Sequence, residues 1–294
     1  MSGRAHSSAR QRTAAGFTVV ELVVTMTISV IVVAFSALFI STPVQGFIDQ
    51  SRRGQLVDQA NAALDRVARD IRRALPNSVR TRLSGGIAAV ELLGTVDGAR
   101  YREQPPGGPA RVLDFAAADG SFNVIGRFDR ISKPFSSTTH FLSIYNVGVP
   151  GADAYELTNV ITPAGTQIDI AADSFGSEDR VSLSPPVRFS YGSPSRRIFL
   201  VDGVVTYLCD PTTGLLRRYS GYDIALNQSA RDSHAELMAA GASVAVLADL
   251  VSSCRFDYAP GTAERAGLVT LELDLSDQGE TVTLLTQVHV DNAP

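Results

Sequence analysis

The sequence predicts an α+β protein, in which one long N-terminal helix packs on an antiparallel β-sheet head. Three observations support this prediction. Residues 22–48 form an apolar run without any Asp, Glu, Lys or Arg, an amphipathic pattern follows it, and short apolar runs separated by turn residues begin at Asn77. We therefore expect a helix over residues 17–75 and a β-rich head over residues 76–294.

The composition restricts the class of protein. Of the 294 residues, 45% are hydrophobic and 19% are charged, which is too apolar for a disordered chain and not apolar enough for a multi-span membrane protein. The net charge of −4 provides no bulk attraction to nucleic acid, so we expect no nucleic-acid partner. Two cysteines exclude a disulfide-dense scaffold and a multi-cysteine zinc cluster, and we expect neither a metal nor a cofactor.

The apolar run is long enough to cross a membrane. A hydrocarbon core about 30 Å thick needs roughly 20 apolar helical residues, which predicts a span over about residues 17–40. A leader of residues 1–16 precedes it and carries Arg4, Arg10 and Arg12 but no acid. A secretory signal has an apolar region of only about 7–15 residues, so this run is too long for one. On hydropathy alone, an uncleaved signal anchor remains the alternative.

A short motif stands at the junction between leader and span. Gly16 is followed by Phe17, and Glu21 lies four residues further, one helical turn along the same face. A carboxylate at the edge of a membrane helix is costly and therefore indicates function. This pattern resembles the class III signal of type IV pilins and pseudopilins, in which glycine, phenylalanine and a glutamate at the fifth mature position open an apolar helix.

The resemblance implies a type IV pilin-like fold and a processing route. Prepilin peptidase would cut between Gly16 and Phe17 and methylate the new amine of Phe17, leaving residues 17–294. The product would be a single-pass protein of the inner membrane, with its head in the periplasm, and would later join a pilus on the cell surface. The implied partners are prepilin peptidase, the inner membrane, its assembly platform, and other major and minor pilins.

Glu21 is the residue that we expect to act in assembly. When apolar helices pack together, an unpaired buried carboxylate costs several kcal/mol. The ammonium group of Phe17 on a neighbouring subunit, shifted by about one helical turn, would neutralise it and fix the register of the two helices. The alternative is that Glu21 reaches the lipid headgroups and has no partner.

The helix is expected to continue beyond the membrane. Apolar residues recur there every three to four positions and form one stripe. They are Leu56, Ala60, Ala63, Leu64, Val67, Ile71, Ala74 and Leu75. We expect Pro43 and Gly46 to kink or locally melt the helix, and Pro76 to end it after Leu75.

The head is predicted to consist of short antiparallel strands. Asp202 and Gly203, between two apolar runs, predict a tight hairpin turn. Residues 268–275 alternate between apolar and mostly polar side chains, as a half-buried strand does. Residues 235–250 are assigned a short helix. The predicted strands cover residues 87–93, 111–115, 139–145, 167–170, 196–201, 204–208, 215–219, 255–258, 268–275 and 281–290.

The two cysteines lie in this head. If the head is periplasmic, as the resemblance implies, the oxidising compartment favours a Cys209–Cys254 disulfide. Pilins often connect their C-terminal region in this way. Two free buried thiols, or half of a metal site, are the alternatives.

The residues around the cysteines carry a closer resemblance. Tyr207-Leu208-Cys209-Asp210, Cys254-Arg255-Phe256-Asp257-Tyr258 and the C-terminal Gln287-Val288-His289-Val290 are similar to minor pilins of the MshO type, from the mannose-sensitive haemagglutinin (MSHA) pilus. This resemblance implies a low-abundance subunit that helps to start or cap the filament. A J-like pseudopilin of type II secretion shares the same stem and junction and is the alternative.

No catalytic motif is evident. The sequence contains no His-Glu-x-x-His, no Gly-x-Ser-x-Gly and no Gly-x-x-x-x-Gly-Lys. Asp232, Ser233 and His234 are neighbours, but adjacency in sequence does not make a triad. We expect no catalytic residue and no enzyme; an anchored periplasmic enzyme or binding protein is the alternative of a different class.

Four acidic residues between positions 169 and 179 have side chains that could bind calcium. Asp169, Asp173, Glu178 and Asp179 supply oxygen ligands, but their spacing fits no calcium-loop template. A solvated acidic loop is the favoured interpretation.

Overall fold

The computed structural model describes residues 16–104, 111–174, 177–261, 265–290 and 292–293. The chain divides into two compact units, one ending at Arg52 and the other beginning at Arg53. Helix α1 (Val19–Arg72) runs through both of them. Apart from Gly16, the predicted leader lies outside the described residues.

Helix α1 is continuous over 54 residues. The local melting expected at Pro43 and Gly46 does not occur, because both positions have helical backbone. A proline removes a single intrahelical donor, and the long apolar flanks offer its neighbours no other partner for their backbone groups. The helix therefore continues through Pro43 and Gly46.

The helix ends three residues earlier than expected. Ala74 pairs with Gly94 of a neighbouring strand, and the N–H of Leu75 donates to the carbonyl of Leu93 over 2.8 Å. These bonds need extended backbone, so pairing with the sheet ends α1 at Arg72 before Pro76 is reached.

A ten-stranded antiparallel sheet dominates the second unit. Its main order is β10-β9-β8-β2-β3-β7-β6-β4, while β1 pairs with β2 and β5 with β8. The strands are β1 (Arg80–Ser84), β2 (Ile87–Tyr101), β3 (Asp119–Ile125), β4 (Phe135–Ser137), β5 (Phe141–Ser143), β6 (Gln167–Ala172), β7 (Asp179–Val187), β8 (Arg197–Asp210), β9 (Leu215–Ser220) and β10 (Ser243–Ala248). The α+β class is therefore present in the structure.

A second, three-stranded antiparallel sheet has the order β11-β12-β13. Its strands are β11 (Val251–Ala259), β12 (Gly267–Asp277) and β13 (Glu280–Val290). The predicted alternation in residues 268–275 is confirmed, since Val269, Leu271, Leu273 and Leu275 are fully buried and the residues between them are partly exposed.

The predicted hairpin at Asp202 and Gly203 is wrong. Strand β8 continues through both residues, and Gly94 pairs with Gly203 whereas Thr95 pairs with Val201. Asp202 is therefore the extra residue of a bulge. No turn forms at Asp202 and Gly203 because β2 is long enough to pair with β8 on both sides of the bulge.

Two other expectations differ from the structure. Residues 111–115 are irregular, although the N–H of Leu113 donates to the carbonyl of Arg102 over 3.0 Å. The helix expected over residues 235–250 is only α2 (His234–Ala239), and the rest of that segment forms a turn and β10. A Ser233–Glu236 capping box fixes the start of α2. Two 3₁₀ turns, η1 (Ala154–Glu156) and η2 (Gln228–Ala230), complete the elements.

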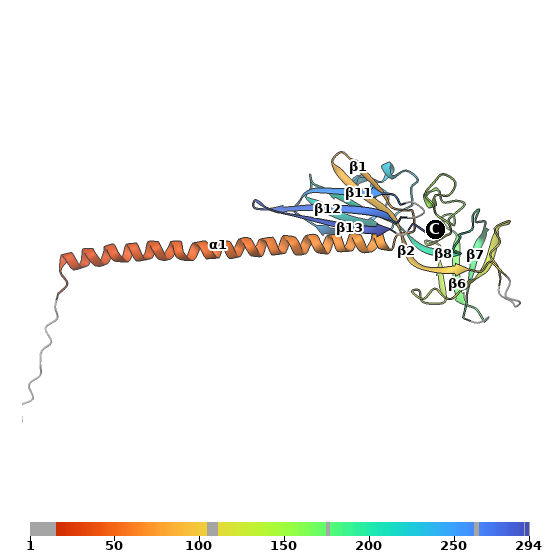
Figure 1. Ribbon diagram of the computed structural model, residues 1–294, viewed down its shortest axis with the longest axis horizontal. Coiled ribbons are helices and arrows are strands. Elements are labelled where there is room, and N and C mark those ends of the chain that lie inside the picture. Colours follow the sequence, from red (N-terminus) through yellow and green to blue (C-terminus); the bar gives the residue numbers. More distant parts are fainter. Residues whose placement is uncertain (1–15, 105–110, 175–176, 262–264, 291, 294) are drawn as a thin grey trace, which may run out of the picture. The chain divides into compact units, whose positions relative to one another are not determined.

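The apolar stripe of α1 forms the first core with both sheets. Strands β11, β12 and β13 lie along the C-terminal part of α1 (Figure 1), and Leu64, Val67 and Ile71 pack in one cluster with Leu271 and Leu273. The stripe predicted from sequence is buried as expected. A second cluster joins Leu75, which follows α1, to the loop around η1, and a third lies between β3, β6, β7 and the outer halves of β2 and β8.

Substitution of Leu64 by Ala tests whether this stripe stabilises the second unit. Leu64 is 1% exposed, so the change should lower the free energy of unfolding by about 2–5 kcal/mol. Denaturant unfolding of the full chain in detergent micelles measures the loss. Asn61→Ala, on the exposed side of the same helix, is the control and should change stability by less than about 0.5 kcal/mol. Equal effects of the two variants would contradict the assignment of the core.

Candidate assembly site at the N-terminal junction

The junction residues precede α1 in non-helical backbone. Gly16, Phe17 and Thr18 are exposed, and 77% of the surface of Phe17 is accessible. The hydroxyl of Thr18 accepts the N–H of Glu21 over 3.3 Å, and its carbonyl accepts the N–H of Leu22 over 3.1 Å. Thr18 therefore caps the helix, and the sequence Thr-x-x-Glu supplies half of a capping box. This signal is readable in the sequence, although no cap was predicted there.

Glu21 stands in the first turn of α1 and is exposed. Within the described part of the chain, no cation or hydrogen-bond donor contacts its carboxylate. A negative charge at this end of a helix is favoured by the helix dipole, worth about 0.3–1 kcal/mol. The dipole thus gives Glu21 a local role, while both carboxylate oxygens stay available to a group from outside the chain.

The N-terminal part of α1 has no side covered by the described residues. Val19–Ala37 has a mean hydropathy of 2.3 over 19 residues, and none of this stretch is buried. At 1.5 Å per residue it is about 28 Å long, enough to cross a membrane. The hydroxyls of Thr25 and Thr27 donate to the carbonyls of Glu21 and Val23, which satisfies these donors within the helix itself.

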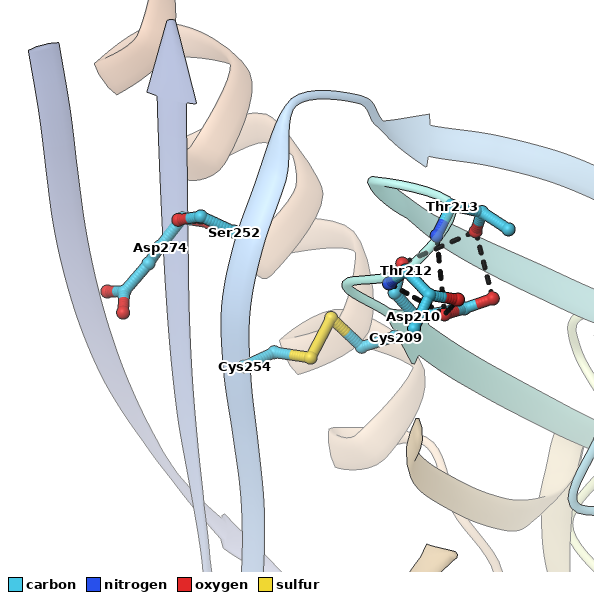
Figure 2. Close-up of a disulfide and its surroundings, with 7 residues drawn as sticks. All are labelled: Cys209, Asp210, Thr212, Thr213, Ser252, Cys254 and Asp274. Atoms are coloured by element: carbon cyan, nitrogen blue, oxygen red, sulfur yellow. Dashed lines mark hydrogen bonds between the residues drawn. A yellow bond between two sulfur atoms is a disulfide. The ribbon is translucent and has the colours of Figure 1, made fainter. Parts of the chain in front are cut away.

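The disulfide connects the two sheets of the second unit. Cys209 lies near the end of β8 and Cys254 within β11, with their Cα atoms 6.4 Å apart (Figure 2). The structure therefore shows a disulfide in place of the alternatives of free thiols or metal ligation. Across β11 and β12, the hydroxyl of Ser252 donates to the carbonyl of Asp274.

A tight turn follows Cys209 directly. The Asp210 carboxylate accepts the hydroxyls of Thr212 and Thr213 over 2.6 and 2.9 Å, and the backbone N–H of Thr212 over 3.0 Å (Figure 2). Burial alone would raise the pKa of Asp210, but the hydrogen bonds from Thr212 and Thr213 outweigh it and hold the pKa below its ordinary value of 3.8. The ionised carboxylate thus holds the turn beside the disulfide.

The four acids with calcium-ligand chemistry are not assembled as one site. Asp173 pairs with Arg180 over 3.0 Å, and Asp179 pairs with Lys133 over 2.5 Å. Glu178 pairs with Arg102, and Asp169 accepts the hydroxyl of Ser136. In the part of the chain that the structure describes, no three metal-ligating side chains are placed to share an ion.

The neighbouring Asp232, Ser233 and His234 have separate partners. Asp232 pairs with Arg82, and Ser233 caps α2. His234 shares a hydrogen bond of 2.7 Å between its Nδ1 and the hydroxyl of Tyr219. These contacts anchor the α2 segment to the sheet and do not form a triad.

Comparison with protein-family models, with curated proteins and with solved structures finds no match for this chain.

Replacing Cys209 by Ser should lower the stability of the second unit. The bridge spans 45 positions, for which the chain-entropy model gives about 4 kcal/mol. The melting temperature of the variant should fall under oxidising conditions and match that of the reduced wild-type chain. An unchanged melting temperature under oxidising conditions would show that the bridge does not stabilise the fold.

Replacing Asp210 by Asn should destabilise the protein in a pH-dependent way. Because the folded pKa is lowered, the contribution of Asp210 is present above pH 3.8 and is lost as the pH falls through the folded pKa. The gap between wild type and variant should therefore be constant near neutrality and shrink in acid. Denaturant unfolding at several pH values measures it, with the exposed Asp58→Asn as control. A gap that persists undiminished in acid would refute this role.

Proposed function

We propose that this chain is a minor pilin, a structural and assembly subunit of an MSHA-like type IV pilus, which enters the filament through its N-terminal helix. One observation carries the proposal. Directly after Gly16 and Phe17 comes an exposed apolar helix whose first turn holds a carboxylate, on Glu21, with no partner among the described residues.

Processing at this junction would create the cation of an intermolecular ion pair, in which Glu21 is the anion. Cleavage after Gly16 leaves an ammonium group on Phe17, and N-methylation keeps its charge. In a bundle of apolar helices, Glu21 of one subunit then pairs with the ammonium of Phe17 on another, because each charge alone would be unpaired in a dry environment. The ion pair fixes the axial register of the stems.

The exposure of the apolar stretch supports the same proposal. A surface of valine, isoleucine and phenylalanine on all sides of a helix is unstable in water and is covered either by lipid or by other helices. The subunit uses lipid before assembly and the stems of other pilins afterwards. Its β-rich unit remains outside and contacts other minor subunits.

Mass spectrometry of the mature chain tests the processing step. In cells with an active prepilin peptidase, the N-terminal peptide should begin at Phe17 and carry one methyl group. A chain that still begins at Met1 in those cells would reject the proposal. Gly16→Leu should remain unprocessed and serves as the matched control.

Glu21→Val tests the ion pair. The variant should enter the membrane and be processed, but its incorporation into filaments should fall by about tenfold or more, because the Phe17 ammonium of its neighbour loses its counter-charge. Immunoblots of sheared filaments against the membrane fraction measure incorporation.

A second variant separates pairing from helix capping. Thr18→Val removes the hydroxyl that caps the helix, worth about 1 kcal/mol of helix stability, but keeps the carboxylate. It should enter filaments like the wild type. Normal incorporation of Glu21→Val, or equal loss in both variants, would contradict the pairing.

A further inference from the structure

A polar cavity of about 100 Å³ lies in the second unit, at the C-terminal end of α1. Its charged wall consists of Arg66, Asp70 and Arg73 on α1 and the turn that follows it, Asp202 on β8 and Arg218 on β9. Three guanidinium groups thus face two carboxylates, and the wall has a net charge of about +1 at neutral pH.

Asp70 is already satisfied by groups of the chain itself. Its carboxylate accepts the hydroxyl of Tyr207 over 2.6 Å and Nε of Arg218 over 2.9 Å. Burial and the hydrogen bond to Asp70 raise the pKa of Tyr207, so the phenol stays a donor. Asp70 and Arg218 therefore form a closed pair, which neither attracts nor repels a ligand strongly.

The other two guanidinium groups have donors to spare. Nε of Arg66 lies 3.5 Å from Asp70 and is a weak second partner. Arg73 has no carboxylate within ion-pair distance among the described residues, and the one hydrogen bond that its guanidinium makes to them is a long one, 3.4 Å, to the carbonyl of Thr95. Guanidinium groups in this state bind oxyanions with short, charge-assisted hydrogen bonds.

The lining also contains the carboxylate of Asp202. Asp202 stands in the β8 bulge and packs over Gly94, where a Cβ atom would lie 2.5 Å from its carboxylate oxygen. Within the described residues, Asp202 makes no ion pair. A single carboxylate is too few ligands for a metal ion, and no group of three suitable side chains occurs in the described part of the chain.

From this arrangement we propose that the cavity is a binding site for one small oxyanion of the phosphate or carboxylate type. Arg66 and Arg73 hold the oxygens of the ligand, while Leu92 and Val205 contribute the apolar part of the lining. Asp202 opposes the ligand charge and restricts binding to anions small enough to stay near the arginines. This proposal does not depend on the proposed function, since it concerns only the second unit.

Titration with inorganic phosphate tests the site. The probe is added to the full chain in detergent micelles at low ionic strength, and binding is followed by calorimetry and by the rise in melting temperature. The wild type should show saturable binding that sodium chloride at equal ionic strength does not reproduce. Arg66→Gln and Arg73→Gln should each weaken the affinity about tenfold, whereas Arg217→Gln, on β9 but outside the cavity lining, should leave it unchanged.

The negative charge of Asp202 gives an independent test of the proposed anion site. Asp202→Asn removes the repulsion and should tighten phosphate binding several-fold. Acetate is the second probe: if it competes with phosphate, the site accepts carboxylate side chains of a partner chain, and if it does not, the site selects phosphate. The absence of saturable binding, wild-type affinity in both arginine variants, or weaker binding by Asp202→Asn would each overturn the proposal. The melting temperature of each variant without phosphate shows that it is folded.

Discussion

The apolar surface of α1 has to be covered by two different environments, and the rest of the structure follows from this constraint. Residues 19–37 are predominantly apolar and are not covered by any described residue of the chain. Beyond Arg53 most apolar residues lie on one face, and this face packs in a core with both sheets. One continuous helix thus combines a segment that needs lipid or other helices with a segment that organises its own β-rich unit.

The pairing of β2 with β8 extends this organisation away from the helix. Their first stretch of pairing contributes to the core around α1, and their second stretch to a separate core around β3, β6 and β7. A buried ion pair joins β2 to β1. Glu91 of β2 is 1% exposed, and its carboxylate lies 2.5 Å from the guanidinium of Arg80 on β1. Burial raises the pKa of Glu91, against the attraction of Arg80, which shows that desolvation offsets much of the favourable charge interaction in this pair. The bulge at Asp202, between the two stretches, also shapes the arginine-lined cavity.

The spacing of apolar residues in the sequence predicted correctly those elements that bury one face and expose the other. The stripe of α1 and the alternation of β12 are one-sided surfaces, and both are buried as expected. Strands without such a pattern were missed. β7 contains Pro185 and Pro186, and β10 consists of small and aliphatic residues directly after a helix. β1, β3 and β4 were also missed, because they are short or interrupted by polar residues, and their partners are fixed only in three dimensions.

The two candidate sites also differ in how far they can be predicted from the sequence. Gly16, Phe17 and Glu21 are close in sequence, so their spacing alone makes the junction recognisable. The cavity draws Arg73, Asp202 and Arg218 from distant elements, and no spacing could have indicated it.

The role of Glu21 at the start of the helix is compatible with the proposed pairing, because the two use different atoms. Capping uses its backbone N–H, which donates to the hydroxyl of Thr18, and the helix dipole acts on its charge wherever the carboxylate points. Neither occupies the carboxylate oxygens. A helix that begins at Val19 also leaves the amine of Phe17 outside the hydrogen-bonded ladder, exposed and beyond the cap. The start of α1 therefore leaves the carboxylate of Glu21, and the ammonium that the proposed cleavage would create on Phe17, without a partner among the described residues of the chain. The proposed pairing between chains requires this.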